Sequence, residues 1–116
     1  MDGDGDLDLI TGEDDQQNKV YLNNSTSNSF PAAPGDTIGA EADDTRAIAI
    51  GDLDHDGYLD VVVANYDQPD RVYLNNSSEA PFNGVASFGF GSTHTCCIAT
   101  GDVDNDGEID VVTGGM

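Results

Sequence analysis

The sequence predicts an all-β protein built from repeats, and two observations support this fold class. Short runs of β-branched and apolar residues alternate with turn-forming residues, and no segment shows helical periodicity. Related segments also recur after about fifty residues, since Asp8, Asp60 and Asp110 precede equivalent runs at steps of 52 and 50. A fixed period of this length is typical of propellers, solenoids and other repeat arrays. Residues 1–116 therefore form one expected domain of about two repeats plus an overlapping loop and strand.

The clearest expected strand covers residues 59–64, a nearly continuous run of apolar residues. A short run of this kind is typical of a strand that is buried on both faces. Equivalent runs at residues 7–11 and 109–113 predict two further strands of the same kind. One such strand is expected directly after each acidic stretch of the chain.

The repeats are expected to contain four short strands each. Turn-forming Asn-Asn-Ser segments follow two of them. Residues 31–44, rich in Pro, Gly, Ala and acidic residues, are the longest stretch expected to be irregular. In chain order the remaining expected strands cover residues 20–22, 37–40, 47–50, 72–74, 86–90 and 97–100.

The acidic stretches follow one nine-residue pattern, Asp-x-Asp-x-Asp-Gly-x-x-Asp. It puts carboxylates at loop positions 1, 3 and 5, a glycine that lets the backbone bend sharply at position 6, and a closing carboxylate at position 9. Carboxylates this close repel one another unless a cation is present. Calcium takes six to eight oxygen ligands at about 2.3–2.6 Å, which this loop can supply. The aspartates are Asp52, Asp54, Asp56 and Asp60 in one full copy, and Asp102, Asp104, Asp106 and Asp110 in the other.

A truncated third copy opens the chain with Asp2, Asp4 and Asp8. Its position 1 is missing, so we expect a weaker calcium site, or one that water or a neighbouring chain completes. The loops differ from EF-hands, which need flanking helices and a Glu at position 12. Val63 and Thr113 stand at that position here, each within an expected strand.

The composition is strongly acidic, with a net charge of −20 from 23 acidic and three basic residues. Thirteen of the acids lie in the three loops, so bound ions would offset much of the charge, and self-repulsion should loosen the fold without them. Nucleic acid and anionic membrane surfaces are poor partners for such a chain. No apolar run has the length that a membrane span needs, and no signal peptide is visible.

Other reactive or aromatic residues have simpler explanations. Cys96 and Cys97 are expected on opposite faces of a strand as small buried residues, with an intermolecular disulfide as the alternative. His55 at loop position 4 and His94 are expected to be surface residues. Tyr73 and its repeat equivalent are expected to pack between repeats. No serine has a nucleophile-like setting, and the carboxylates repeat with the fold period, so we do not expect an enzyme.

The loop, the following apolar strand and the period together resemble the FG-GAP/VCBS repeats, the calcium-binding blades of integrin-α-type β-propellers. The resemblance runs through the whole chain. It includes the Ile-Ala-Ile-Gly segment that ends at Gly51, the Val-Tyr-Leu-Asn-Asn segments and, more loosely, residues 88–91. It implies blades of four antiparallel strands, about two per chain. It also implies that calcium is held by the loop aspartates together with the backbone carbonyls of Tyr58, Glu108 and, in the truncated loop, Asp6.

Blade number is where the chain departs from the family pattern, because propellers close with about four to eight blades. Two blades alone would expose sheet faces and edges. We therefore expect either a homo-oligomer that closes a propeller ring by association, or a fragment of a longer repeat protein. Association is favoured because the chain overlaps itself by one loop and one strand.

The resemblance implies a non-enzymatic calcium-binding module for interaction or adhesion, extracellular or at the cell surface, with calcium in a structural role. Its partner would be a protein or a glycan, in addition to copies of itself. One alternative is a carbohydrate-binding propeller or the scaffold of a polysaccharide-degrading enzyme. The absence of Trp, the commonest sugar-stacking residue, weakens that alternative. Another is a fragment of a repeat protein with no function of its own.

Overall fold

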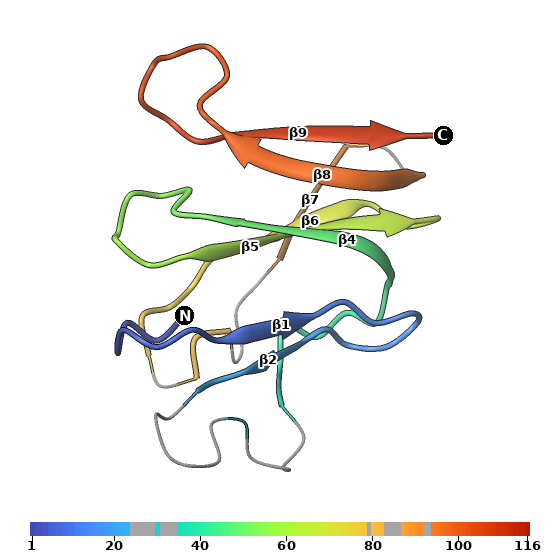
Figure 1. The fold of residues 1–116 in the computed structure, drawn as a ribbon. Helices are drawn as coiled ribbons and strands as arrows, with labels where there is room; N and C mark the ends of the chain where they lie inside the picture. Colours follow the sequence, from blue (N-terminus) through green and yellow to red (C-terminus); the bar gives the residue numbers. More distant parts are fainter. Residues whose placement is uncertain (24–29, 31–34, 79, 83–86, 92–93) are drawn as a thin grey trace.

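A computed structural model of the chain describes residues 1–23, 30, 35–78, 80–82, 87–91 and 94–116 (Figure 1). The described residues form antiparallel strands and no helix, which confirms the all-β prediction. No helix in this part of the chain could therefore span a membrane. The strands are β1 (Leu9–Thr11), β2 (Lys19–Tyr21), β3 (Asp36–Thr37), β4 (Asp44–Gly51), β5 (Asp60–Tyr66), β6 (Asp70–Tyr73), β7 (Ser87–Phe90), β8 (Thr95–Gly101) and β9 (Asp110–Gly115).

The strands form three sheets of unequal size. Their orders are β1-β2-β3, β4-β5-β6-β7 and β8-β9, and each neighbouring pair is antiparallel. Figure 1 shows the three sheets layered in chain order, with β4–β7 between the other two. The acidic loops leave their sheets at one common end of the stack, on the left of that view. The fold therefore gathers the loops although they lie about fifty residues apart in sequence.

The repeat seen in the sequence is also a repeat of register. Gly51 pairs with Asp60 where β4 meets β5, and Gly101 pairs with Asp110 where β8 meets β9. Both pairs of strands have an irregularity at the same place, after Thr45 and after Thr95. β4 and β8 are therefore one kind of strand, and β1, β5 and β9 another.

The hydrophobic core lies between the first two sheets. Apolar side chains alternate to one face along each strand, and these faces meet between β1–β2 and β5–β6. Tyr73 is buried there, as expected for packing between repeats. The buried members are Val20, Ile38, Val61, Val63, Tyr73 and Phe82, with Ile10 and Ile48 at the edge.

The prediction that the strand after each loop is buried on both faces is confirmed for β5 but not for the equivalent strands β1 and β9. Residues 60–65 are buried, because β5 has a sheet on either side of it. The same prediction is wrong for β1 and β9, where Leu9 and Val112 are 46% and 51% exposed. Each of these strands lies in an outer sheet, and no further sheet of the described residues covers its second face.

Three local expectations also need correction. The strand expected at residues 37–40 is the two-residue β3, because Ile38 donates its N–H to Asn18 O at 2.8 Å and the chain turns at Gly39, with φ 66°. Residues 31–44 are not wholly irregular, since they include β3 and the start of β4; residues 31–34 and Ala86 lie outside the described residues. Cys96 is half-buried and Cys97 exposed, both as free thiols, because the outer face of β8 is uncovered.

Candidate metal centre

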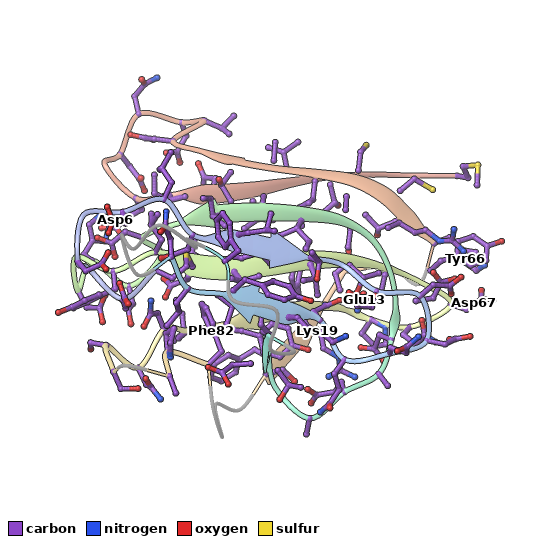
Figure 2. All side chains as sticks on the ribbon, turned by 60° about the horizontal axis from the view of Figure 1, so that its bottom comes forward. Asp6, Glu13, Lys19, Tyr66, Asp67 and Phe82 are labelled. Carbon is purple, nitrogen blue, oxygen red and sulfur yellow. The ribbon has the colours of Figure 1, made fainter. Side chains whose placement is uncertain are left out.

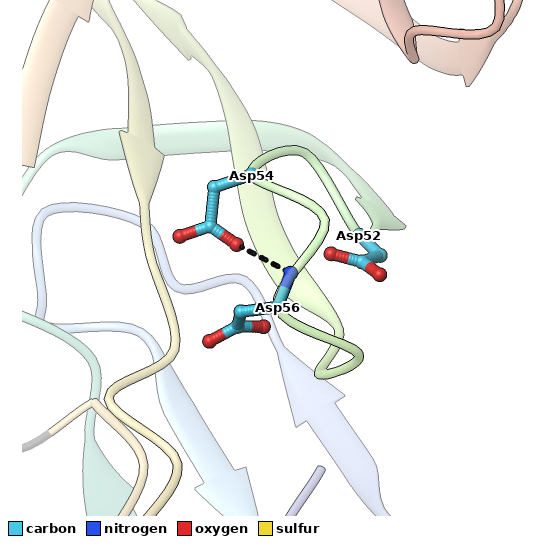
Figure 3. Close-up of side chains that lie close together, drawn as sticks. All are labelled: Asp52, Asp54 and Asp56. Carbon is cyan, nitrogen blue, oxygen red and sulfur yellow. Dashed lines mark hydrogen bonds between the residues drawn. The ribbon is translucent and has the colours of Figure 1, made fainter.

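The loop between β4 and β5 brings three of the predicted ligands together. The carboxylates of Asp52, Asp54 and Asp56 offer oxygens that all lie within 4.8 Å of one another (Figure 3). Asp102, Asp104 and Asp106 form the same cluster between β8 and β9. Three carboxylates at this spacing match the oxygen-rich shell that calcium prefers.

Hydrogen bonds from the backbone to aspartate side chains shape the loop between β4 and β5. Asp54 Oδ1 accepts from the N–H of Asp56 at 3.2 Å, and Asp56 Oδ1 accepts from that of Tyr58 at 2.9 Å. Asp52 Oδ2 closes the turn by accepting from Gly57 N at 3.1 Å. Gly57 takes φ 90°, a value that glycine tolerates best. The aspartates thus organise the backbone with one oxygen and keep the other available.

The loop before β9 repeats this geometry. Asp104 Oδ1 accepts from Asp106 N at 3.2 Å, and Asp106 Oδ1 accepts from Glu108 N at 2.9 Å. Asp102 Oδ2 accepts from Gly107 N at 3.0 Å, and Gly107 has φ 97°. Two loops that share no sequence beyond the pattern therefore adopt one conformation.

One carboxylate oxygen indicates that a cation suits the loop between β4 and β5. Asp52 Oδ1 is buried and has no hydrogen-bond partner. A buried carboxylate oxygen without a donor is costly, and a bound cation would satisfy it. The donor set is carboxylate oxygen alone, which suits a hard divalent ion rather than a thiolate- or imidazole-bound metal. The residues present therefore fit calcium.

The closing aspartate at position 9 lies outside the clusters of three. Asp60 is fully buried, and its Oδ2 accepts from Leu53 N at 2.7 Å while Oδ1 accepts from Asn75 N at 2.8 Å. Burial raises the pKa of Asp60, and the nearby charges of Asp54 and Asp56 add to this rise, although the two hydrogen bonds oppose it. In the structure, Asp60 ties the base of the loop to the turn after β6. Its predicted role as a calcium ligand stays a prediction.

Asp110 has half of this arrangement, since its Oδ2 accepts from Val103 N at 2.8 Å. Asp8 makes both contacts, but the donor of one of them differs. Its Oδ1 accepts from Asn23 N at 2.9 Å, and its Oδ2 contacts the α-ammonium group of Met1. Met1 stands at loop position 2, so its ammonium group takes the place of the peptide N–H that Leu53 supplies in the loop between β4 and β5.

The truncated first loop is folded like the others. Asp2 Oδ1 accepts from Asp4 N at 3.2 Å, and Asp4 Oδ1 accepts from Asp6 N at 2.9 Å. Within the described residues, Asp2, Asp4 and Asp8 do not form a third cluster of the kind seen in the full loops. The predicted carbonyl ligands, on Asp6, Tyr58 and Glu108, all belong to position 7, and their role stays a prediction.

Neighbouring loops touch one another. His55 is a half-exposed surface residue, as expected, and it also contacts the next loop, with Nδ1 3.1 Å from Glu108 Oε2 and Nε2 3.3 Å from Gly107 O. Gly3 occupies the same position 4 in the first loop, and its Cα faces the ring of Tyr58. A cleft of about 250 Å³ opens between these two loops. Position 4 of each of the first two loops in the chain therefore lies against position 7 of the following loop.

The opposite end of the sheets carries a second polar surface, where Figure 2 shows Tyr66 and Asp67 far from Asp6. His94 Nε2 lies 2.8 Å from Asp67 Oδ1, and its ring meets Tyr66 edge to face. Arg46 lies over the other aromatic ring, 5.5 Å from the Tyr66 centroid. His94 is half-exposed, as expected.

Sequence reasoning missed the residues that connect the sheets at this end. Buried Asn18 and Asp70 each bond a hydroxyl of the following sheet, on Thr45 and Thr95 respectively. The sequence does contain a signal for them, because Asn18 and Asp70 are 52 residues apart and each stands two positions before a repeated Val-Tyr-Leu segment.

The fold and the loops together define the class of protein: an all-β repeat protein with acidic, glycine-containing loops at one end of stacked antiparallel sheets. The model of the FG-GAP-like repeat matches the chain twice, over residues 1–63 and 52–113. The chain therefore belongs to the FG-GAP repeat family, as the sequence resemblance predicted. No curated protein and no solved structure matches it.

Proposed function

We propose that the chain is a non-enzymatic, calcium-binding module of the FG-GAP repeat family, in which calcium has a structural role. The observation that supports this most directly is the cluster of Asp52, Asp54 and Asp56, with Asp52 Oδ1 buried and unpaired. A cation there would neutralise the three carboxylates and hold together a loop that connects two strands of the middle sheet. Asp60 and Asp110 would close the shell from position 9.

The binding affinity should suit calcium-rich surroundings. Extracellular modules of this kind bind calcium with Kd of roughly 10⁻⁴–10⁻³ M, because their ligands are exposed and flexible. All three residues of the cluster Asp102, Asp104 and Asp106 are exposed, whereas Asp52 is partly buried, so we expect the cluster around Asp52 to bind calcium more tightly. We place the protein outside the cell or at its surface because the chain belongs to the FG-GAP repeat family.

Thermal unfolding in millimolar calcium and in chelator tests this function. Asp54→Ala and Asp104→Ala should each lower the melting temperature in calcium and leave it nearly unchanged in chelator, since the lost ligand matters only when the ion is bound. Asp14→Ala is the matched control, because Asp14 is an exposed acid outside the loops. Equal losses in both conditions would mean that the loops are not ion sites.

We also propose that the sheets are blades of an incomplete β-propeller and that copies of the chain associate to close it. The outer sheets leave apolar side chains in water, among them Leu9 and Val112. Association would cover these faces, as β4–β7 is covered on both sides. Light scattering after gel filtration in calcium should give a discrete multiple of 12.1 kDa. A monomeric mass at high concentration would overturn the association and leave the calcium role to be judged separately.

A further inference from the structure

Two of the acidic loops lie next to each other at the same end of the fold (Figure 1). We call residues 52–60 the middle loop and residues 102–110 the last loop, after the sheets that carry them. His55 extends from the middle loop to the last one, where Nδ1 lies 3.1 Å from Glu108 Oε2 and Nε2 lies 3.3 Å from Gly107 O. One side chain therefore connects the two candidate calcium loops.

The bases of these loops are connected as well. Thr100 Oγ1 donates to Ile50 O at 2.7 Å, and each of these residues stands two positions before its loop begins. An added Cβ at Gly51 would lie 3.3 Å from Ile109 Cγ2, so the two sheets pack closely where the middle loop begins. Because the loops are held together at base and tip, the conformation of one constrains the other.

The backbone of the middle loop directs the His55 side chain. His55 has φ 60°, a left-handed value that costs energy in a residue other than glycine. Backbone N–H groups of the loop bond to Asp52, Asp54 and Asp56 and maintain this turn. The same three carboxylates repel one another when no cation is bound. A cation in the middle loop would therefore stabilise the conformation that places His55 against the last loop.

His55 contacts the last loop at two positions that bear on its own cation. Gly107, at position 6, has φ 97° and donates its N–H to Asp102 Oδ2 at 3.0 Å. Glu108 follows at position 7, where the backbone carbonyl is a predicted ligand. Holding these two residues in place reduces the conformational freedom that the last loop must lose when it binds an ion. Such preorganisation raises affinity without adding a ligand.

We propose that His55 couples the two loops, so that calcium in the middle loop makes the last loop bind calcium more tightly. This inference rests on the proposed calcium binding and adds the order in which the sites fill. The middle loop fills first, because Asp52 is partly buried whereas the cluster of the last loop is exposed. Its occupation then prepares the weaker site. His55 is a positioning residue, since none of its atoms is among the predicted ligands.

The expected size and direction of the effect follow from exposure and charge. The side chains of His55 and Glu108 are 50% and 68% exposed, so their contact should change calcium affinity by only about threefold. Charge acts in the opposite direction, because an empty middle loop is more negative and would attract a cation to the last loop more strongly. The direction of the effect therefore distinguishes the contact from electrostatics through space.

Nuclear magnetic resonance of the isotope-labelled full chain can follow each loop separately during a calcium titration. The amide N–H groups of Gly57 and Gly107 donate to Asp52 and Asp102, so each amide signal reports on its own loop. Asp54→Ala removes a ligand and should leave the middle loop empty. We expect it to raise the calcium concentration at the midpoint of the Gly107 signal by about threefold.

Removing the contact should abolish this shift. In a His55→Gly background, Asp54→Ala should leave the Gly107 midpoint unchanged or lower it, because only charge then connects the loop tips. Glycine is the matched replacement, since Gly3 has φ 82° at the same position of the first loop. Glu108→Ala removes the contact from the other side and keeps the predicted carbonyl ligand, so it should also abolish the shift.

A conservative replacement and a distant histidine complete the set of variants. His55→Asn keeps an N–H donor as many bonds from the backbone as Nδ1, so it should retain part of the shift. His94→Ala removes a histidine that contacts Tyr66 and Asp67 at the opposite end of the same two sheets. It should leave the shift intact.

An unchanged Gly107 midpoint in Asp54→Ala, with both glycines responding to calcium in the wild-type chain, would overturn the coupling and leave calcium binding standing. An equal shift with and without His55 would show that the strands carry the coupling, and would overturn the role of His55. Loss of the shift in His94→Ala would overturn it too, since general stability of the sheets would then be the cause. If neither glycine responded to calcium in the wild-type chain, the proposed function would fail and the coupling with it.

Discussion

Thr95 Oγ1 donates a hydrogen bond to Asp70 Oδ2 at 2.7 Å, and both residues are buried. Thr95 begins β8 and Asp70 begins β6, so this bond connects the last sheet to the middle one. The second oxygen of Asp70 accepts from Asn65 N at 3.0 Å within the middle sheet. The carboxylate of Asp70 thus accepts a hydrogen bond from the backbone of its own sheet and a second one from the side chain of Thr95 in the next sheet.

A similar contact connects the first sheet to the middle one, which we call the first junction, as the contact between the middle and last sheets is the second. At the first junction the hydrogen bond to the threonine hydroxyl runs in the opposite direction. Asn18 Oδ1 accepts from Glu13 N at 2.9 Å, and Asn18 Nδ2 donates to Thr45 Oγ1 at 3.0 Å. A carboxylate cannot donate, so at the second junction the threonine must do so. The hydroxyl of Thr45 instead donates its hydrogen bond to Asn65 Oδ1 at 3.0 Å. The contact between sheets is therefore a property of the repeat, although its residues differ.

Removing the hydroxyl at the second junction should destabilise the protein. Thr95→Val keeps the shape of the side chain but leaves a buried carboxylate oxygen without its donor, which costs about 2–3 kcal/mol. Denaturant unfolding in calcium measures the loss. Thr113→Val is the control, because Thr113 is exposed on β9, and it should change the free energy of unfolding little. A loss no larger than the control's would mean that the bond does not stabilise the junction.

The closing aspartate should behave differently from the clustered ones. Asp60→Ala leaves the N–H groups of Leu53 and Asn75 without acceptors, so it should lower stability by about 3 kcal/mol in chelator, and by more in calcium, where a proposed ligand is lost as well. Asp54→Ala should act in calcium alone. Thermal unfolding of the two variants side by side checks this difference. If Asp60→Ala also acted only in calcium, Asp60 would be a ligand with no structural role of its own.

The sequence predicted the strands that follow each loop because composition and period agreed there. β5, β1 and β9 all lie where the apolar runs begin, and the loops take the expected carboxylate spacing. It could not predict their burial. β9 carries the same Val-Val pair as β5, but exposure depends on whether another sheet covers the strand. That is a property of the stack and is not encoded in any one segment.

The connections between sheets were unpredictable for a different reason. Asn18 and Asp70 are ordinary turn residues by composition, and only three-dimensional packing brings them against Thr45 and Thr95. Position 9 shows the same limit. Spacing alone makes Asp60 a ligand, whereas in the fold its two oxygens are bonded to backbone N–H groups from two segments. The pattern identifies the acidic residue, but it does not identify the backbone N–H groups that bond to its oxygens in the fold.

A pH-dependent contribution should come from Glu41, which lies between β3 and β4. Its carboxylate accepts from the hydroxyls of Ser87 at 2.6 Å and Tyr73 at 3.3 Å, and faces Arg71 at 3.6 Å. Burial opposes ionisation, but the bond from Ser87 and the charge of Arg71 outweigh it, so the pKa of Glu41 lies below its ordinary value of 4.5. Ionised Glu41 therefore stabilises the fold above that pH.

Since the pKa is lowered in the folded state, this stability should be lost as the pH falls through the folded pKa. Glu41→Gln should cost about 1 kcal/mol near neutral pH, because the group is partly solvated, and the difference from wild type should shrink below pH 4.5. Denaturant titrations at several pH values measure this. Asp36→Asn, an exposed acid on β3, is the control. A difference that stays constant with pH would show that the charge of Glu41 contributes nothing.

The loop glycines offer a test of backbone strain in isolation from packing. An added Cβ at Gly57 or Gly107 would meet no atom within 4 Å, yet both residues have φ near 90°, at 90° and 97°. Gly57→Ala and Gly107→Ala should therefore each cost about 1–2 kcal/mol through conformation alone. Because the strained turn also orients the carboxylates, calcium should bind more weakly to both variants, by titration calorimetry.

Gly101 is the matched control for this prediction. It too has open space around an added Cβ, but it lies in β8 and its φ is outside the left-handed region. Gly101→Ala should leave the free energy of unfolding unchanged or raise it by about 0.5 kcal/mol, since alanine loses less entropy in a strand. Equal losses at Gly57, Gly107 and Gly101 would mean that the added methyl group, and not the loop conformation, causes the effect.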